Sequence, residues 1–277
     1  MLIHVVADYG HGDLAFAEVA QRLCLQLPEA TLVLTPVPAF DTVSAGFCVG
    51  QLALTPGPAD RVVFHNVAPR ADTPDPRPGN QGERLVCARL DTGVLVVGAN
   101  AGYTFSFLRD EALTLREVRC SSAGSQFRSR DFFPELLARV MAGDESVLGE
   151  PLLPDAVAEL PQRRVVYVDG YGNLKTSWFS APVASGERVE VTIDGQTALA
   201  TVTDGTFEVA VGELAFAPGS SGWPRRHAAP LRFLELFLRG DSAAERFGRP
   251  RAGTTVEVRP ATGPGVSLGR HGGCALR

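Results

Sequence analysis

The spacing of apolar and polar residues changes character along the chain. In the first half, apolar runs at 2–10, 30–37 and 61–69 alternate with segments at 13–27 and 40–54, whose apolar residues recur every three or four positions. The runs are typical of buried strands, and the spacing of three and four is typical of amphipathic helices. Strands that alternate with helices predict an α/β layer for this half.

Further elements follow before the chain reaches its middle. The apolar runs on either side of Asp91-Thr92-Gly93 predict a β-hairpin, because aspartate and glycine favour the tight turn between paired strands. Another strand is expected at 113–119, and the apolar spacing predicts a helix from about residue 132 to residue 141. The proline-rich stretch that comes next indicates a linker. We therefore assign residues 1–145 to an N-terminal α/β domain and 146–163 to a linker.

The second half is built from shorter runs. Between residues 164 and 260, apolar residues mostly alternate with polar ones or are β-branched, and several turns contain Asp-Gly or Gly. This pattern predicts a small antiparallel barrel or sandwich, with a helix only near 242–248. The glycine-rich residues 261–277 are expected to be disordered. The expected fold class is therefore α/β, with an N-terminal α/β domain followed by a small antiparallel β domain.

Composition restricts the classes of function. The 277 residues carry a formal net charge of -5 and no long run of lysine or arginine, which argues against nucleic acid as the main partner. No apolar stretch approaches the roughly 20 residues that span a bilayer, and the opening residues are too soon polar for a signal peptide. We therefore expect a soluble, cytoplasmic protein with no membrane partner. The five cysteines have no zinc or redox spacing, so free thiols and no metal site are expected.

A polar stretch precedes the helix expected at 132–141. Residues 125–131 read SQFRSRD, in which Arg128 and Arg130 flank Ser129 where loop becomes helix. Unpaired backbone N–H groups and the helix dipole favour negative charge at such a position. The stretch therefore predicts an anion site at Ser129, and Ser129 and Arg128 are the candidate catalytic residues.

Five segments along the chain resemble, in the same order, the motifs of one known protein family. They are ADYGHGD, TPVPAFDTVSAGF, SQFRSRDFFPELLARVMAG, YVDGYGNLKTSW and GSSGW. The first resembles the Thr-Asp-Phe-Gly-x-x-Asp opening of the S-adenosylmethionine hydroxide adenosyltransferase family, which includes the fluorinase and chlorinase enzymes. The second is similar to that family's Pro-Pro-Phe-Asp helix start, and the third to its Ser-Thr-Phe-His-Gly-Arg-Asp segment. The last two resemble its Asp-x-Phe-Gly-Asn-x-x-Thr-Asn and Asn-Ser-x-Gly-Tyr motifs. The resemblance covers nearly the whole chain.

The resemblance implies an N-terminal α/β sandwich domain joined to a C-terminal small antiparallel β-barrel domain at 164–260. It also implies a homotrimer in which each site lies between one subunit's first domain and its neighbour's second. In this family, water or a halide attacks the 5′ carbon of S-adenosylmethionine, and neutral methionine leaves. S-adenosylmethionine is thus the implied substrate or ligand, and no cofactor is implied.

Seven positions acquire implied binding roles from the motifs. They are Asp8 for the ribose diol, Asp13, Asp169 and Ser220 near the methionine amino group, Asn173 for the adenine edge, and Phe40 and Tyr171 as apolar walls. Structural alternatives exist: carboxylates cap helix starts, Asp-Gly and Gly-Asn form tight turns, and aromatic residues fill cores. The joint occurrence of these residues in one order favours ligand binding.

The segment that handles the nucleophile departs from the hydrolytic members. Their motif Asp-Pro-Gly-Val-Gly-Thr-x-Arg corresponds here to VAPRADTPDPR, which places Ala68 at the acid and Asp75 near the arginine, with Arg77 reachable by a small shift. Arg128 replaces the family's histidine, and Ser129 replaces its glycine. Methyl and guanidinium groups cannot accept a proton, so slow or absent hydrolysis is expected.

Three functional hypotheses follow. The first is an S-adenosylmethionine-cleaving enzyme, similar to a hydroxide adenosyltransferase or hydrolase, with altered nucleophile-handling residues. The second is a catalytically silent protein that binds S-adenosylmethionine or adenosine. The third is a halide-using adenosyltransferase, because the fluorinase branch also has a serine where Ser129 lies. His11 and His65 receive no role, since the first is expected in solvent and the second lies on a strand whose facing is undecided.

Overall fold

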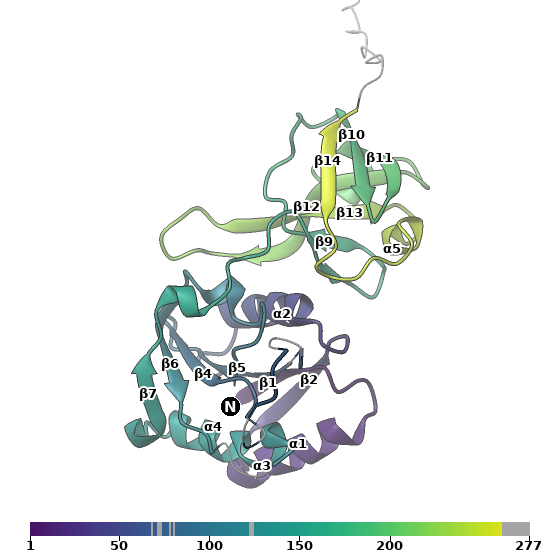
Figure 1. Cartoon of the computed structure of the whole chain (residues 1–277). Coiled ribbons are helices and arrows are strands. Elements are labelled where there is room, and N and C mark those ends of the chain that lie inside the picture. Colours follow the sequence, from purple (N-terminus) through teal and green to yellow (C-terminus); the bar gives the residue numbers. More distant parts are fainter. Residues whose placement is uncertain (68, 71–73, 78, 80, 122–124, 262–277) are drawn as a thin grey trace, which may run out of the picture.

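The computed structural model describes residues 1–261 except 68, 71–73, 78, 80 and 122–124. The chain has an α/β fold built on two seven-stranded sheets, one below the other in Figure 1. Helices cover both faces of the first sheet, and the later part of the chain forms the second sheet. The α/β class expected from the sequence is confirmed.

The first sheet has the strand order β2-β1-β3-β5-β4-β6-β7. Its strands are β1 (Leu2–Ala7), β2 (Thr31–Pro36), β3 (Val62–Asn66), β4 (Leu85–Leu90), β5 (Leu95–Ala99), β6 (Ala112–Val118) and β7 (Leu148–Pro151). β1, β2, β3 and β5 run parallel, so their carboxyl ends meet at one edge of the sheet. β4 pairs antiparallel with β5, which confirms the hairpin expected around residues 91–93.

Helices pack on both faces of the first sheet because successive strand residues point to opposite sides. On one face, α1 (Leu14–Gln26), α3 (Arg128–Asp131) and α4 (Phe133–Met141) surround a core that includes Phe64 and Leu137. On the other face, α2 (Thr42–Leu54) packs against a second core that includes Val63 and Phe105. Short 3-10 helices occupy Ser106–Leu108 (η2), Glu145–Val147 (η3), Pro154–Ala156 (η4) and Thr206–Glu208 (η5).

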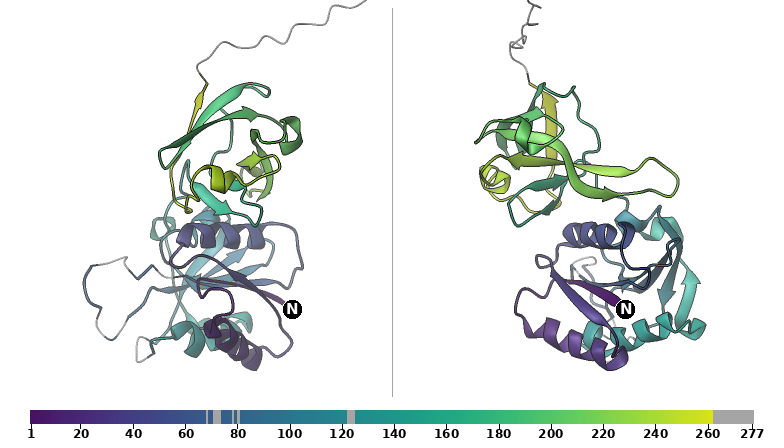
Figure 2. Two further views of the ribbon diagram at one scale, coloured as in Figure 1. Left: turned by 90° about the vertical axis from the view of Figure 1, so that its right-hand side faces the viewer. Right: turned by 180° about the vertical axis from the view of Figure 1, so that it is seen from behind.

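Helix α2 lies between the two sheets (Figure 2). Its residues are buried without a break from Thr42 to Gly50, whereas a surface helix buries only one stripe. Trp223 and Phe233 of the second sheet share a hydrophobic core with this helix. A Cβ at position 50 would lie 2.9 Å from Cβ of Phe107 and 3.2 Å from Trp223. Glycine at this position therefore allows the second sheet to approach α2 closely.

The second sheet has the strand order β14-β10-β11-β12-β13-β9-β8. Its strands are β8 (Val165–Val168), β9 (Leu174–Thr176), β10 (Arg188–Ile193), β11 (Gln196–Val202), β12 (Leu214–Trp223), β13 (Leu231–Leu238) and β14 (Val256–Pro260), and α5 (Ala243–Arg246) is its short helix. Neighbours pair antiparallel except β11 and β12, which pair parallel. The N–H of Val165 donates to the carbonyl of Thr254 at 2.9 Å, so the sheet curls until its two edges meet.

Two local elements differ from the sequence-based expectation. The helix expected from about residue 132 is preceded by a separate turn of helix, α3, because the chain bends at Phe132. The segment 146–163, expected to be a linker, contributes β7 to the edge of the first sheet, where a proline such as Pro151 is tolerated because one side of the strand lacks a neighbour. Residues 262–277, expected to be disordered, lie outside the described residues. Among the helices of the described chain, none has the length and apolar character needed to traverse a bilayer.

Candidate functional site

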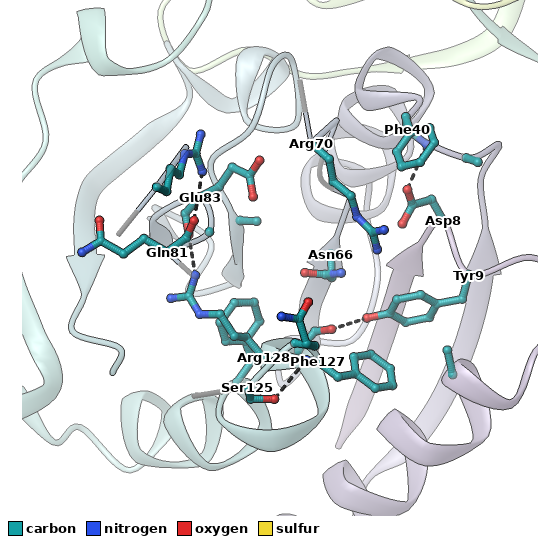
Figure 3. A pocket seen from close by; sticks show the side chains of 18 of the residues that line it. Asp8, Tyr9, Phe40, Asn66, Arg70, Gln81, Glu83, Ser125, Phe127 and Arg128 are labelled. Atoms are coloured by element: carbon teal, nitrogen blue, oxygen red, sulfur yellow. Dashed lines mark hydrogen bonds between the residues drawn. The ribbon is translucent and has the colours of Figure 1, made fainter. Parts of the chain in front are cut away.

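A pocket of about 840 Å³ opens at the carboxyl ends of the parallel strands of the first sheet (Figure 3). It is lined by Asp8, Tyr9, Asp13, Ala15, Ala39, Phe40, Asn66, Arg70, Asp75, Arg77, Gln81, Gly82, Glu83, Ala99, Ser125, Gln126, Phe127, Arg128, Ser129 and Phe133. The chain leaves β1 through α1 on one face of the sheet and later reaches β3 through α2 on the other face. Loops diverge at such a reversal, which is where open α/β sheets bind ligands.

Asp8 follows β1 directly and lines this pocket. Its Oδ2 accepts a hydrogen bond from the backbone N–H of Phe40 at 2.9 Å, which ties the end of β1 to the loop before α2. Burial raises the pKa of the Asp8 carboxyl, while the hydrogen bond from Phe40 and the charge of Arg70 oppose that rise. Because Asp13 is the residue that caps α1, helix capping does not account for Asp8.

Phe40 forms one wall of the pocket, as expected from its motif position. Its backbone has a φ of 63°, a conformation that non-glycine residues rarely adopt, and the hydrogen bond to Asp8 holds it there. The residue is 52% exposed, and the guanidinium carbon of Arg70 lies 5.9 Å from its ring centroid. An aromatic ring left this exposed marks a surface that can bury apolar area against a ligand or another chain.

Asp13 has a structural role in addition to its place on the pocket wall. It is the N-cap of α1, and its Oδ1 accepts a hydrogen bond from the N–H of Ala15 at 2.8 Å. The capping alternative raised from the sequence is therefore correct for this residue. The cap uses only Oδ1, and Asp13 also lines the pocket.

Ser129 is brought to the pocket by α3 and is almost fully buried, with 4% of its surface exposed. The hydroxyl of Tyr9, which follows β1, donates a hydrogen bond of 2.6 Å to Ser129 Oγ (Figure 3). Burial raises the pKa of the Tyr9 phenol far above its ordinary value, and hydrogen bonds with Ser129 and Asn66 act in the opposite direction. Because α3 is a single turn of helix, its dipole is small, and the hydroxyl itself is the main polar group here.

Arg128 also lines the pocket, with its guanidinium between two segments of chain. Its Nη1 lies 3.4 Å from the carbonyl of Glu83, a long contact, and its guanidinium carbon lies 5.6 Å from the Phe133 ring centroid. Within the described part of the chain, its buried Nε has no hydrogen-bond partner. A Cβ at position 82 would come within 2.6 Å of Arg128 Nη1, so Gly82 makes room for this side chain. The cation is thus held by packing and retains donor capacity.

Arg130, the second arginine of SQFRSRD, does not line the pocket and instead forms ion pairs within the fold. Its Nε donates to Asp131 Oδ1 at 2.7 Å, its Nη1 donates to Glu18 at 2.9 Å, and its guanidinium lies over Phe127. These carboxylates raise the pKa of Arg130, and Arg130 lowers that of Asp131. Arg130 therefore fastens α3 to α1 and does not face the pocket.

Three residues predicted from the second half, Asp169, Tyr171 and Asn173, lie together in one loop that does not line the pocket. In the 169–173 loop, Asp169 Oδ1 accepts hydrogen bonds from the N–H groups of Tyr171 and Asn173, each at 3.0 Å. Asp169 Oδ2 accepts a third from the Asn173 side-chain amide at 3.0 Å. The carboxylate thus organises its own turn, and the amide expected to read adenine is engaged by it. Tyr171 is 84% exposed, so it is not a core aromatic of this chain.

The structure brings together only part of the predicted site. Ser129, Arg128, Asp8, Asp13 and Phe40 surround one pocket. Asp169, Tyr171, Asn173 and Ser220 are not among the residues that line it. Within a single chain the two groups therefore remain separate.

The remaining candidate residues do not supply a base in the pocket. His65 faces the α2 side of the sheet, is completely buried beside Phe105, and has a pKa lowered to about 3 by burial. His11 is exposed, as expected. Ala68, the predicted replacement for the family's acid, lies outside the described residues.

Tyr9, Asn66 and Arg70 are among the pocket residues that were not anticipated from the sequence. Tyr9 carried a signal, because it stands where the resembling motif has phenylalanine and so adds a hydroxyl within ADYGHGD. Asn66 ends β3, and the carboxyl end of a parallel strand is a position where ligand-binding residues concentrate. Arg70, with a φ of 56°, lies in an irregular loop whose course no local pattern specifies.

The comparisons with known proteins establish likeness of fold alone. Neither a protein-family model nor a curated protein matches the chain. An uncharacterized conserved protein from Thermotoga maritima is similar in structure, with a TM-score of 0.71 and 19% identity, over 93% of this chain and 100% of that one. A conserved hypothetical protein from Thermus thermophilus has a TM-score of 0.66 and 23% identity, over 93% of this chain and 99% of its own. The architecture is therefore shared over almost the full length of these three proteins.

Proposed function

We propose that this protein is an S-adenosylmethionine-cleaving enzyme related to the hydroxide adenosyltransferases and to the fluorinase and chlorinase enzymes, with altered nucleophile handling. In this proposal, an α/β sandwich domain and a small β-barrel domain form the subunit, as the sequence resemblance implies. The observation that carries the proposal is the pocket at the strand ends, where residues from three separate motif segments, Asp8, Phe40 and Ser129, line one cavity. Its volume of about 840 Å³ is adequate for a nucleoside-sized ligand.

The reaction transfers the 5′ carbon of the ribose from sulfur to a nucleophile. A lone pair on the nucleophile forms the new bond to the carbon, the carbon–sulfur bond breaks, and its electron pair remains on sulfur in neutral methionine. Water would also have to release a proton to a base, whereas a halide or hydroxide ion would not. Asp8 suits the ribose diol because a carboxylate accepts hydrogen bonds from two adjacent hydroxyls.

The groups near Ser129 favour a nucleophile that is already an anion. The guanidinium of Arg128 stays charged at ordinary pH and cannot take a proton, but it attracts negative charge. Arg128 and Ser129, whose guanidinium and hydroxyl are hydrogen-bond donors, line the same pocket. Slow or absent hydrolysis and an anion site at Ser129 are therefore part of the proposal.

A neighbouring copy of the chain would complete the site. The second group of predicted residues, Asp169, Tyr171, Asn173 and Ser220, would come from that copy, in a closed homo-oligomer that we propose to be a trimer. The exposure of Phe40 (52%) and Tyr171 (84%) supports this, because both rings would bury apolar surface on ligand binding and assembly. Light scattering should give about three times the chain mass of 29.4 kDa, and a value near 29.4 kDa at working concentration would contradict the assembly.

The test of function is to incubate the protein with S-adenosylmethionine, alone and with chloride or fluoride, and to separate the products by chromatography. Methionine together with adenosine or a 5′-halo-adenosine would support cleavage.

Asp8→Ala should weaken adenosyl-ligand binding by about 1 to 3 kcal/mol, because it leaves hydroxyl donors unpaired. Asp204→Ala, at an exposed carboxylate away from the pocket, is the matched control and should bind normally. Absence of binding to both adenosine and S-adenosylmethionine by the unmodified protein would refute the proposal.

Two further variants examine the nucleophile. Arg128→His combined with Ala68→Asp should raise adenosine release if the remaining residues are competent, because it restores groups that can accept a proton. Strong hydrolysis by the unmodified protein that persists in Arg128→Ala would contradict the anion account and would imply other water-handling residues, such as His11.

The second candidate function is a silent adenosyl-ligand binding protein. The observation in its favour is that the described pocket offers hydroxyl and guanidinium groups near Ser129 and no histidine. Calorimetric binding of S-adenosylmethionine without release of methionine under any of the anion conditions would favour this candidate over the enzyme.

A further inference from the structure

Tyr9 and Ser129 are 120 residues apart in sequence and share the hydrogen bond of 2.6 Å beside the pocket. The Tyr9 ring makes edge-to-face contacts with Phe16 at 5.1 Å and with Phe127 at 5.8 Å between ring centroids. Phe16 belongs to α1, and Phe127 directly precedes α3. The phenol is therefore held by packing on two sides, and its hydroxyl reaches Ser129 from a fixed direction.

The direction of this hydrogen bond determines what Ser129 can offer a ligand. Tyr9 donates this hydrogen bond and Ser129 Oγ accepts it. Once Oγ accepts from Tyr9, the serine's own hydrogen needs another acceptor, and none is found among the described residues. A hydroxyl that accepts one hydrogen bond becomes a better donor in the next, because linked hydrogen bonds polarise each other.

We propose that Tyr9 is a positioning residue that directs the Ser129 hydroxyl proton into the pocket and thereby makes Ser129 a donor for an anionic nucleophile. This inference rests on the proposed function and goes beyond it, because it assigns the preference for an anion to a residue outside the SQFRSRD stretch. A halide or hydroxide ion accepts the Ser129 hydrogen bond without losing a proton. A neutral water molecule gains no base from the pair.

The experiment is a double-mutant cycle on the full-length protein. Methionine release from S-adenosylmethionine in chloride is measured for the unmodified protein, Tyr9→Phe, Ser129→Ala and the double variant. Tyr9→Phe removes only the hydroxyl and keeps both ring contacts, so the fold should be retained. We expect it to lower kcat about tenfold with little change in KM for S-adenosylmethionine, and to have no further effect in the Ser129→Ala background. Tyr103→Phe, which removes a phenol hydroxyl outside the pocket, should change neither constant.

An equal loss on Tyr9→Phe in both backgrounds would overturn the inference, because Tyr9 would then act independently of Ser129. A normal kcat in Tyr9→Phe would overturn it as well. If the unmodified protein releases no methionine with any nucleophile, the proposed enzyme function fails, and the cycle is measured instead as chloride binding by chlorine NMR line broadening. There, Tyr9→Phe should weaken chloride binding about fivefold only when Ser129 is present. Absence of chloride binding by the unmodified protein, or unchanged binding in Tyr9→Phe, would overturn the inference in that case.

Discussion

The pocket on the first sheet and the 169–173 loop on the second both collect polar residues expected to bind a ligand, yet they hold these residues differently. Around the pocket, Arg128 keeps a buried nitrogen that has no partner in the described chain, and Ser129 is held by one hydrogen bond from Tyr9. In the loop, Asp169 accepts three hydrogen bonds from its own turn. The polar groups of the first region are only partly used by the described chain, whereas the Asp169 carboxylate of the second fixes a backbone shape.

Charged residues next to the 169–173 loop are also used by the fold, in a buried ion pair. Lys175 Nζ lies 2.8 Å from Glu235 Oε1 and 3.8 Å from Asp169 Oδ2, and Glu235 is only 1% exposed. A Cβ at Gly219 would lie 1.8 Å from the same Glu235 oxygen, so the glycine lets β12 pass directly over the carboxylate. Lys175 thus links the Asp169 carboxylate of the 169–173 loop to Glu235 on β13. The charged residues of the second region therefore stabilise the pairing of its strands.

The largest expected effect comes from breaking this pair. Glu235→Ala should lower the free energy of unfolding by about 3–5 kcal/mol, because it leaves the Lys175 ammonium buried without its partner. Urea unfolding of the variant measures the loss. Asp8→Ala, on the pocket side, should change stability far less, since its carboxylate is only partly buried.

A double variant separates pairing from burial. Lys175→Met combined with Glu235→Leu replaces both charges by apolar groups and should recover most of the stability. If Glu235→Ala instead costs no more than Asp8→Ala, the contrast between the two regions is wrong.

A smaller effect on stability is expected from His65, which is completely buried in the first sheet. Burial lowers its pKa to about 3, whereas a histidine in the unfolded chain titrates near its ordinary value of 6.5. Between these values the unfolded state binds the extra proton, so stability is lost as pH falls through this window. From pH 8 to pH 5 the loss due to His65 should be about 2 kcal/mol.

Urea unfolding at both pH values tests this expectation. His65→Phe keeps an aromatic ring beside Phe105 and should abolish that share of the pH dependence. His11→Phe, at an exposed position, is the control and should keep it. An unchanged pH dependence in His65→Phe would show that the imidazole is not held neutral in the folded state.

The smallest effect is expected at Asp13, where capping and ligand binding can be separated. Asp13→Ala should cost about 1 kcal/mol of stability through loss of the N-cap, whereas Asp13→Ser should retain most of it because serine also caps. If Asp13 also holds the ligand's amino group, both variants should weaken S-adenosylmethionine binding. Equal binding by both variants and the unmodified protein would restrict Asp13 to capping.

Much of the fold and half of the candidate site could be predicted from the sequence. The period of apolar residues predicted β1, α1 and α2, and the residues that follow a strand, such as Asp8, could be expected at its carboxyl end. The strand β7 was missed because Pro151 and the prolines that follow it are typical of a linker, and only an edge position makes Pro151 acceptable. The parallel pairing of β11 with β12 was missed because consecutive short strands favour antiparallel neighbours.

The sequence by itself determined the order of helices and strands, the turn at 169–173 and the cap at Asp13, because each depends on residues only a few positions apart. The tertiary structure alone decided that Tyr9 meets Ser129, that His65 faces the core and that Lys175 meets Glu235, since these contacts join distant segments. It also decided that Arg130 forms a salt bridge with Glu18, whereas Arg128 lines the pocket. Two arginines of one short motif look alike in sequence, and they differ only in which neighbouring element each one meets after the chain has folded.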